Sequence, residues 1–327
     1  MPVKSPNDWD INLRPTSWDE YVGQEKVKNN LRISIDAAKK RGGTLEHVLF
    51  YGGSGLGKTS LAGIIAQEMG ATLRTCAGPS MEKTGDLASL LTNLEEGDIL
   101  FVDECHRIPK IVMESLYSAL EDYTLHLILG RGPMARTMEL RIPHFMLIGA
   151  TTRLSLLPAP FRNRFGSIFQ FSFYSQGEIE KILARSAQLL GAPIDPAAIR
   201  MIASRSRATP RIANRILKRV RDFALIQGNG TISPDTTERA FAFFEIDSWG
   251  LEQADRKLLE ILMTTFKGGP AGIQALAAAM NEDQETVLDV LEPYLLQLGL
   301  VERTPKGRVA TPLAYKHMGA RAQDKMV

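Results

Sequence analysis

The chain has little cysteine and no long apolar run. Its 327 residues include two cysteines, Cys76 and Cys105, whose spacing matches no metal-binding pattern and fits incidental thiols in a reducing compartment. No stretch of eighteen apolar residues is present, which argues against a transmembrane helix. The N-terminal segment MPVKSPNDWD lacks the apolar core of a secretory signal. These absences predict a cytoplasmic protein without membrane attachment.

A strong charge of either sign is also missing, because 39 basic residues nearly balance 37 acidic ones. The balance hides two basic segments. Eight basic residues and no acidic one lie between Arg200 and Arg221, and residues 301–327 carry six basic residues against two acidic ones. Such segments suggest partners that bear phosphate groups, although solvated helix faces produce the same pattern.

The order of apolar segments predicts three domains. Apolar strands alternate with helical stretches up to about residue 172, which is typical of a parallel α/β sheet. The expected strands are 47–51, 71–75, 98–102, 145–150 and 168–172. Only helices are predicted from there to about residue 246, and three helices followed by a hairpin, typical of a winged helix, complete the chain. The predicted domains are residues 1–175, 176–248 and 249–327.

The segment GGSGLGKTS, residues 52–60, matches the phosphate-binding loop of nucleoside triphosphatases. An apolar strand precedes it and a helical pattern follows, so backbone N–H groups at the helix start are expected to face the phosphates. Lys58 would neutralise the β- and γ-phosphates of ATP, and Thr59 would coordinate Mg²⁺. This context disfavours a merely flexible glycine-rich loop.

A second motif, ILFVDECHR, places two carboxylates directly after a buried strand. We expect Asp103 to hold Mg²⁺ through a water molecule and Glu104 to polarise the attacking water. A pair of surface acids after a strand is the alternative. A third segment, FMLIGATTR, ends in Thr151 and Thr152, where a sensor of the γ-phosphate is expected; Thr152 is the candidate.

Two arginines, Arg162 and Arg164, lie in the segment APFRNRFG. An arginine supplied across a subunit interface stabilises the charge of a phosphoryl-transfer transition state, by roughly 10³–10⁵ in rate. Paired arginines also serve as structural ion-pair partners. The residues alone leave both interpretations open.

These motifs, together with TPRIANR, occur in the order found in AAA+ ATPases, and the chain resembles the RuvB family of bacterial motors that drive branch migration of Holliday junctions. The resemblance runs from LRPTSWDEYVGQ at residue 13 to the hairpin near residue 312. Long segments such as MEKTGDLASLLTNLE and VLEPYLLQLGLVERTPKGR are far more specific than the general ATPase motifs. The resemblance implies an AAA+ core, a helical lid and a C-terminal winged helix.

Roles for individual residues are implied by the resemblance. On the first domain it implies an adenine contact at Leu13 and Arg14. It implies a phosphate site at Gly55, Gly57, Lys58, Thr59 and Ser60. A group near the nucleotide is implied at Glu121, Asp122 and Tyr123. Arg164 resembles the finger that acts on the ATP of a neighbouring subunit. Tyr174 and Arg211 would complete the pocket from the lid. DNA would be contacted by Arg303, Lys306 and Arg308.

Partners are likewise implied by the resemblance. It implies a homo-hexameric ring around duplex DNA that acts on four-way junctions and is loaded by a RuvA-type junction-binding protein. A junction-resolving nuclease is a further candidate partner. Residues Leu127–Arg136 have an alternating pattern around a turn, as expected for a protruding hairpin. An exposed apolar hairpin needs a partner to cover it. The segment resembles the RuvA-binding hairpin of the family. A hairpin packed on its own domain is the alternative.

The chain departs from the family pattern at four places. The segment Gly52-Gly53-Ser54-Gly55 stands where Gly-Pro-Pro-Gly is usual. Without the prolines the loop is more disordered before nucleotide binds, and ordering it costs about 0.4–1 kcal/mol per lost proline. We therefore expect weaker nucleotide binding. Cys105 replaces a usual isoleucine, a small apolar change. Asn163 replaces an aspartate between the two arginines. Gln284 replaces a DNA-contacting arginine, so we expect one phosphate contact fewer.

Three other functions fit parts of the chain. A clamp-loader-like AAA+ switch ATPase explains the core and Arg164, but it is expected to end in a helical collar. An unfoldase grips polypeptide with an aromatic pore loop, and residues 71–98 contain no Phe, Tyr or Trp. A winged-helix DNA binder without catalysis leaves the first 175 residues unexplained. The clamp-loader-like ATPase remains the alternative to the motor.

Overall fold

A computed structural model describes residues 13–129 and 136–319. The chain forms two compact units. The first comprises the residues up to Gly52 together with Leu56–Phe173, and the second comprises Gly53–Gly55 together with the chain from Tyr174 onward.

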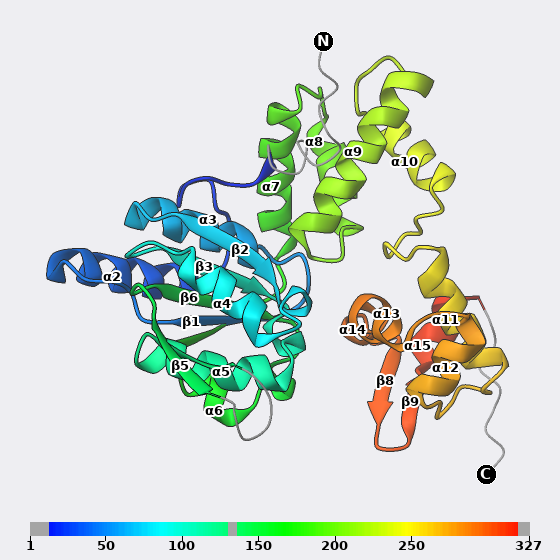
Figure 1. The fold of residues 1–327 in the computed structure, drawn as a ribbon. Helices are drawn as coiled ribbons and strands as arrows, with labels where there is room; N and C mark the ends of the chain where they lie inside the picture. Colours follow the sequence, from blue (N-terminus) through cyan, green and yellow to red (C-terminus); the bar gives the residue numbers. More distant parts are fainter. Residues whose placement is uncertain (1–12, 130–135, 320–327) are drawn as a thin grey trace. The chain divides into compact units, whose positions relative to one another are not determined.

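The first unit is built on a five-stranded parallel sheet (Figure 1). Its strands are β1 (Val48–Tyr51), β2 (Leu73–Ala77), β3 (Ile99–Asp103), β6 (Met146–Thr151) and β7 (Ser167–Gln170). Their order across the sheet is β2-β3-β6-β1-β7. Every strand predicted from the sequence is present, with boundaries that differ by at most two residues. This finding confirms the α/β class.

Helices cover both faces of this sheet (Figure 1). They are α2 (Glu25–Arg41), α3 (Lys58–Met69), α4 (Thr84–Thr92), α5 (Lys110–Glu121) and α6 (Ala159–Arg162), with short 3₁₀ turns η1 (Gly78–Ser80), η2 (Cys105–Arg107) and η4 (Leu154–Leu156). Because side chains alternate along a strand, Leu49, Leu100 and Leu147 pack with α4 and α5, whereas the next residues in each strand face the other way. Both faces are therefore buried, which explains the continuous apolar runs.

An antiparallel hairpin, β4 (Thr124–Leu129) and β5 (Arg136–Arg141), extends from this unit. Leu125 is fully buried, and Leu127 and Leu140 pack partly against the core beneath α5. Met138 is exposed. The base of the hairpin thus packs on its own domain, while the turn of the predicted partner-binding hairpin, residues 130–135, lies outside the described residues.

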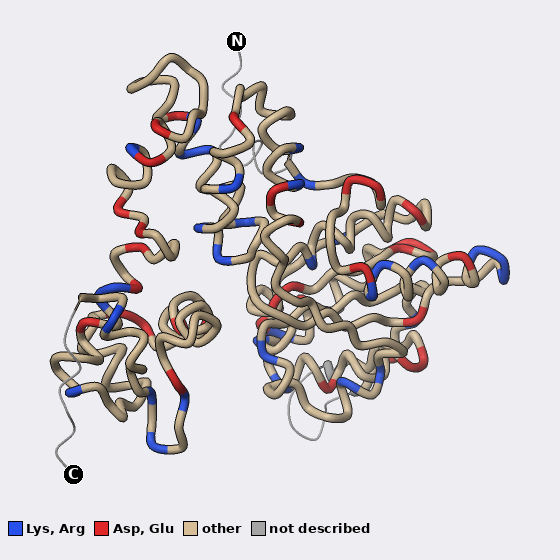
Figure 2. The backbone as a smooth tube through the Cα atoms, turned by 180° about the vertical axis from the view of Figure 1, so that it is seen from behind, with Lys and Arg blue, Asp and Glu red and all other residues tan. Residues whose placement is uncertain are grey.

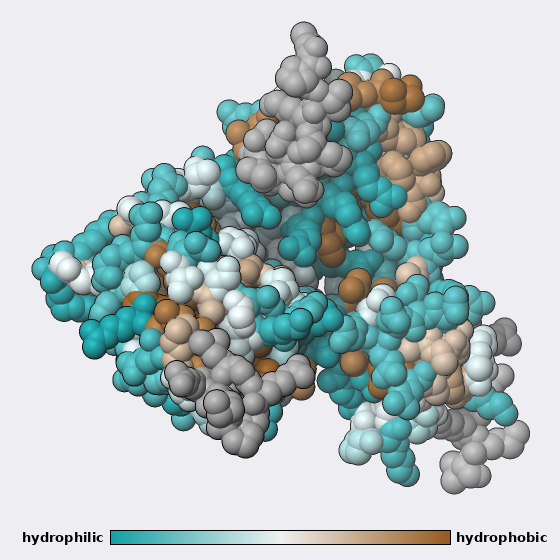
Figure 3. Space-filling model, viewed as in Figure 1, coloured by the Kyte–Doolittle hydropathy of each residue, from teal (hydrophilic) through white to brown (hydrophobic). Residues whose placement is uncertain are grey.

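The second unit begins with four helices (Figure 1), which form the predicted helical lid. They are α7 (Gln176–Leu189), α8 (Pro196–Ser204), α9 (Pro210–Gln227) and α10 (Pro234–Phe243). Ser175 accepts a hydrogen bond from the backbone of Glu178 and caps α7. Leu225, Ile226 and Phe243 remain exposed and contribute to the apolar surface over α9 and α10 (Figure 3).

The rest of the second unit is a winged helix, as predicted. It consists of α11 (Gln253–Thr264), α12 (Ile273–Met280), α13 (Gln284–Thr286), the π-helical turn η5 (Val287–Leu291), α14 (Glu292–Gln297), β8 (Val301–Thr304), β9 (Gly307–Ala310) and α15 (Pro312–His317). The sequence predicted one helix over 284–298. In the structure this helix contains a π turn at Val287–Leu291, just before Glu292 and Pro293. Pro293 has no backbone N–H to donate.

Candidate nucleotide site and DNA interface

The phosphate loop connects the end of β1 to the start of α3. Gly52, Gly55 and Gly57 have φ angles of 146°, 77° and 95°, which favour glycine. At Gly52 a Cβ atom would lie 2.6 Å from the carbonyl oxygen of Phe171, so no side chain fits there. The first turn of α3 has no capping side chain and no acidic residue. Its backbone N–H groups and dipole therefore suit an anion, and this local structure fits the predicted ATP phosphates.

Lys58 lies inside the loop rather than out in solvent. Its Nζ donates a hydrogen bond to the carbonyl oxygen of Gly52 at 2.8 Å, and the residue is buried. The buried Tyr21 adds a contact that the sequence analysis missed, since its hydroxyl donates to the carbonyl oxygen of Gly57 at 3.3 Å. A tyrosine within LRPTSWDEYVGQ gave no local signal of this role. Thr59 and Ser60 follow Lys58 in the first turn of α3 and are half-buried.

The second unit also contributes to the phosphate loop, through its segment Gly53–Gly55. Arg211 Nη1 donates to Ser54 Oγ at 2.9 Å. A Cβ atom on Gly55 would lie 2.8 Å from Arg211 Cβ, so the glycine permits this close approach. The hydroxyl of Ser54, one of the departures from the family pattern, therefore binds the arginine for which a γ-phosphate role is predicted.

The acidic pair lies at the same edge of the sheet as the phosphate loop. Tyr51 pairs with Thr151, and Val102 with Gly149, so β1, β3 and β6 end together. Asp103 closes β3, and its Oδ1 accepts a hydrogen bond from the backbone N–H of Glu104 at 3.0 Å. The register thus brings these carboxylates to the edge from which the phosphate loop departs.

Glu104 has an unusual backbone. Its φ of 49° is left-handed, and Gly78 approaches so closely that a Cβ there would clash with the carbonyl oxygen of Glu104. Its carboxylate, which is half-exposed, pairs with Arg107 at 3.3 Å. Strained residues of this kind cluster at functional sites.

The predicted sensor strand is β6. The buried Thr151 hydroxyl lies 3.0 Å from Nδ1 of His106 and accepts a hydrogen bond from the backbone of Arg153 at 3.0 Å. Thr151 is thereby tied to the turn that follows the acidic pair. Thr152, the candidate sensor, comes next and is half-buried. Its role stays a prediction.

Four predicted site residues form a separate group, here called the amino-edge cluster. It consists of Glu121, Asp122, Tyr123 and Arg164. Arg164 Nη2 pairs with Glu121 Oε1 at 3.0 Å, and its guanidinium lies 4.8 Å from the centre of the Tyr117 ring. Arg164 Nη1 also donates to the carbonyl oxygen of Pro160 at 2.8 Å. The arginine is therefore held on α5 and α6 of its own chain.

The amino-edge cluster lies at the opposite end of β1 from the phosphate loop. His47, directly before β1, has its Nε2 3.1 Å from the carbonyl oxygen of Leu120. The five residue steps from His47 to Gly52 span roughly 17 Å in a strand, at ~3.3 Å per residue. The structure thus does not bring the cluster to the phosphate loop of the same chain.

The remaining predicted nucleotide contacts lie in both units. Leu13 is buried in the first unit, and Arg14 is exposed. Tyr174 is buried in the second unit, where its backbone N–H donates to the carbonyl oxygen of Ala208 at 3.0 Å. The adenine and lid contacts therefore stay predictions.

The three predicted DNA contacts on the wing differ in exposure. Lys306 is exposed, at the turn between β8 and β9, and the side chain of Arg303 is 55% exposed, whereas that of Arg308 is only 13% exposed. Both arginines bind the carboxylate of the buried Glu292. The wing carries basic segments around its turn and one acidic segment on β8 (Figure 2).

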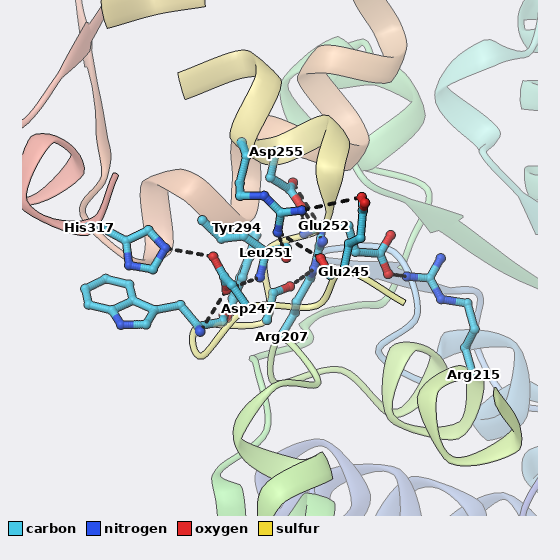
Figure 4. A network of polar contacts seen from close by, with 12 residues as sticks. Arg207, Arg215, Glu245, Asp247, Leu251, Glu252, Asp255, Tyr294 and His317 are labelled. Atoms are coloured by element: carbon cyan, nitrogen blue, oxygen red, sulfur yellow. Dashed lines mark hydrogen bonds and ion pairs between the residues drawn. The ribbon is translucent and has the colours of Figure 1, made fainter. Parts of the chain in front are cut away.

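Three of the eight basic residues between 200 and 221 pair with acidic residues of the winged helix (Figure 4). Arg207 binds the buried Asp255, and Arg215 binds Glu252 at 2.6 Å. Arg219 lies 3.8 Å from the same glutamate. These pairs give the run a structural role, which periodicity could not reveal because the acidic partners lie more than thirty residues away along the chain.

Further contacts lie where the lid joins the winged helix. There Asp247 Oδ2 and His317 Nε2 lie 2.8 Å apart (Figure 4). The hydroxyl of Tyr294 donates to the carbonyl oxygen of Trp249. Burial raises the pKa of Tyr294 to about 12, so its hydroxyl keeps the proton that it donates. The lid and the winged helix are therefore linked by a network of polar contacts.

Two features are absent from the described residues. None of the helices in residues 13–129 and 136–319 is long and apolar enough to cross a bilayer. In the same ranges, no group of three or more His, Cys, Asp or Glu side chains is arranged to hold a metal ion. Thr59 and Asp103 stay the predicted residues for binding Mg²⁺.

Comparisons with known proteins agree with this architecture. Three family models match: the Holliday junction DNA helicase RuvB P-loop domain over residues 13–171, the RuvB AAA lid domain over 174–247 and the RuvB C-terminal winged helix domain over 248–319. The Holliday junction branch migration complex subunit RuvB of Dehalococcoides mccartyi (strain CBDB1) is 52% identical over 309 residues, which cover 94% of this chain and 88% of the relative.

Solved structures are similar over nearly the whole chain. The Thermotoga maritima RuvB Holliday junction branch migration motor is 45% identical and superposes with a TM-score of 0.88, covering 95% of this chain and 100% of that one. A mutant of the same Thermotoga maritima protein gives a TM-score of 0.89 at 44% identity, with the same coverage.

Proposed function

The chain belongs to the RuvB family of Holliday junction DNA helicases, and from this membership we propose that it is an ATP-driven motor that promotes branch migration of Holliday junctions in recombination and DNA repair. The observation that carries the proposal is the strand register. It sets the phosphate loop, Asp103 and Thr151 at one edge of the sheet, in a chain that ends in a winged helix.

In the proposed site, ATP binds along the phosphate loop and Mg²⁺ supplies charge neutralisation at its phosphates. The N–H groups at the start of α3 and the ammonium of Lys58 would hold the phosphates. Thr59 and Asp103 would hold the metal, Asp103 through water. Glu104 would orient the attacking water, and Thr152 would contact the γ-phosphate.

The amino-edge cluster would act between subunits. Arg164 is held beside the carboxyl end of α5, which contacts His47 at the amino end of β1, and the phosphate loop begins at the other end of that strand, roughly 17 Å away at ~3.3 Å per residue. We therefore propose that Arg164, with Glu121, Asp122 and Tyr123, reaches the nucleotide of a neighbouring subunit. A homo-hexameric ring supplies such neighbours. Arg211 would report the γ-phosphate to the lid once ATP replaces its contact with Ser54.

The winged helix would hold the DNA. Arg303 and Lys306 are exposed and suit phosphate contacts, because a motor that moves along any sequence must bind mainly the phosphate backbone. A RuvA-type junction-binding protein would bind the β4–β5 hairpin, and a junction-resolving nuclease is a further candidate partner. The proposed domains of the motor are residues 1–175, 176–248 and 249–327.

The decisive experiment is ATP-dependent conversion of a synthetic four-way junction into duplex arms, with and without a RuvA-type partner. Lys58→Ala should lose nucleotide binding. Glu104→Gln should bind ATP but hardly hydrolyse it. An ATPase rate that is the same with and without DNA, together with no movement of the junction even beside the partner, would refute the motor.

Mixing two inactive variants tests the role of Arg164. Arg164→Ala subunits retain Glu104, and Glu104→Gln subunits retain Arg164, so mixed rings contain complete sites only if the arginine acts across the interface. Partial recovery of ATPase activity is expected. No recovery at any mixing ratio would place Arg164 in its own subunit's site or outside catalysis.

The clamp-loader-like switch ATPase, the alternative from the sequence, is not favoured, because all three matching family models are RuvB domains. It predicts ATPase activity stimulated by DNA without any junction movement. The same junction assay therefore separates the two functions.

A further inference from the structure

Glu292 is a buried carboxylate that lies beside the wing of the winged helix. It begins α14 and is only 2% exposed. Its Oε1 accepts hydrogen bonds from Nε of Arg303 at 3.2 Å and from Nε of Arg308 at 2.9 Å. Its Oε2 accepts from Nη2 of Arg303 at 2.9 Å and from Nη2 of Arg308 at 3.2 Å. One carboxylate thus binds two guanidinium groups side-on.

The strand register explains why a carboxylate is needed there. Arg303 and Arg308 lie directly opposite each other on β8 and β9, and like charges in that position repel. Burial raises the pKa of Glu292, but the hydrogen bonds from Arg308 and Arg303 outweigh it and hold the pKa below its usual value. Glu292 directly follows the π turn η5, and its carboxylate accepts hydrogen bonds from both arginines.

The two arginines are not equivalent. Arg308 is mostly buried, and its backbone also bonds Ala271 in both directions, at 2.9 and 2.8 Å. Arg303 is more than half exposed. An arginine has five N–H donors, and each side-on pair with Glu292 uses two of them. Arg303 therefore keeps three N–H groups for another anion while its guanidinium plane is held in place.

We propose that Glu292 is a positioning residue for DNA binding: it fixes the guanidinium of Arg303 as the phosphate-contacting group of the wing, with Arg308 as the buried support. This inference rests on the proposed function and deepens it. A carboxylate close to a phosphate-binding surface would by charge alone weaken DNA binding. Its orienting effect has the opposite sign, so the two effects can be told apart by experiment.

The test measures the affinity of the full-length protein for duplex DNA at several salt concentrations. Glu292→Gln removes the charge and replaces an acceptor oxygen with a donor, and we expect binding to weaken about tenfold. Glu302→Gln is the matched control, because Glu302 carries the same charge on β8 but is exposed. It should leave affinity unchanged or raise it by about two- to threefold, as loss of a nearby negative charge predicts.

A double variant separates positioning from a merely structural role. If Glu292 acts through Arg303, then adding Glu292→Gln to Arg303→Ala should cause no further loss of DNA affinity, and the lost negative charge should leave the affinity equal or about two- to threefold higher. Glu292→Asp keeps the charge but shortens the side chain, so it should also lose affinity, while circular dichroism and thermal unfolding report that the winged helix is folded. This variant decides the question if Glu292→Gln does not fold.

The outcomes distinguish the inference from the function beneath it. Unchanged or tighter binding by Glu292→Gln, or wild-type binding by Glu292→Asp, overturns the positioning role. Additive losses in the double variant overturn it as well. If Arg303→Ala and Lys306→Ala both bind DNA like the wild type, the proposed DNA contact of the wing fails instead.

Discussion

Removal of the Arg207 guanidinium should strongly destabilise the second unit. The side chains of Arg207 and Asp255 are 7% and 1% exposed, so water cannot replace either partner. Arg207 binds both oxygens of Asp255, and its Nε donates to the carbonyl oxygen of Gly250 at 3.2 Å. Arg207→Met would leave Asp255 buried without a counter-charge. We expect a loss of about 3–5 kcal/mol in the free energy of unfolding.

Arg215→Met is the matched control for this variant. Arg215 also joins the lid to the winged helix, through Glu252, but its side chain is 49% exposed. Exposed pairs contribute about 0.2–1 kcal/mol, so the two variants should differ several-fold. Combining Arg207→Met with Asp255→Leu removes both buried charges and should recover most of the stability.

Urea unfolding monitored by Trp249 fluorescence measures these differences. Trp249 lies where the lid joins the winged helix, with its ring 4.6 Å from that of His317. The substitutions Trp9→Phe and Trp18→Phe would remove the other two tryptophans. The reasoning is refuted if Arg207→Met costs less than about 1 kcal/mol, the range of an exposed pair. It is also refuted if the double variant is no more stable than Arg207→Met.

Three further predictions concern the site and the wing. Ser54→Ala removes the hydroxyl that binds Arg211, so ATP affinity should rise about two- to tenfold in a fluorescent-nucleotide titration; unchanged affinity would show that the hydrogen bond does not compete with nucleotide. Gln284→Arg, at an exposed position that begins α13, should steepen the logarithmic dependence of DNA affinity on salt by about one, and an unchanged slope contradicts the missing contact. Because the pKa of Glu292 is lowered in the folded protein, the carboxylate stabilises the fold above the ordinary pKa of 4.5, and this stabilisation is lost as the pH falls below 4.5. The thermal stability of Glu292→Gln should therefore decline less in acid than that of the wild type. Parallel pH profiles of the two proteins would contradict this.

Local patterns in the sequence were sufficient for much of the fold. Apolar runs with a period of two or 3.6 residues predicted the strands of the sheet, the lid helices and the winged helix, and the structure has them. The glycine-rich run predicted a phosphate loop between a strand and a helix, and the structure has such a loop, with positive φ at Gly52, Gly55 and Gly57. These features depend on neighbours in sequence, so the residues alone determine them.

The long-range pairs required the tertiary structure. No periodicity could show that Arg207 binds Asp255 or that Glu292 holds both wing arginines, since each pair depends on the path of the chain between its members. The same is true of Arg164. The resemblance implied a finger, but only the contacts of Arg164 with Glu121 and of His47 with Leu120 place it at the end of the sheet opposite the phosphate loop.

The sequence by itself therefore determined the elements and the chemistry of the phosphate loop, because hydrophobic period and backbone conformation are local properties. Tertiary structure alone decided which charges are buried together and which face solvent. Burial and Coulomb energy depend on distance in space, and a linear pattern does not contain that distance.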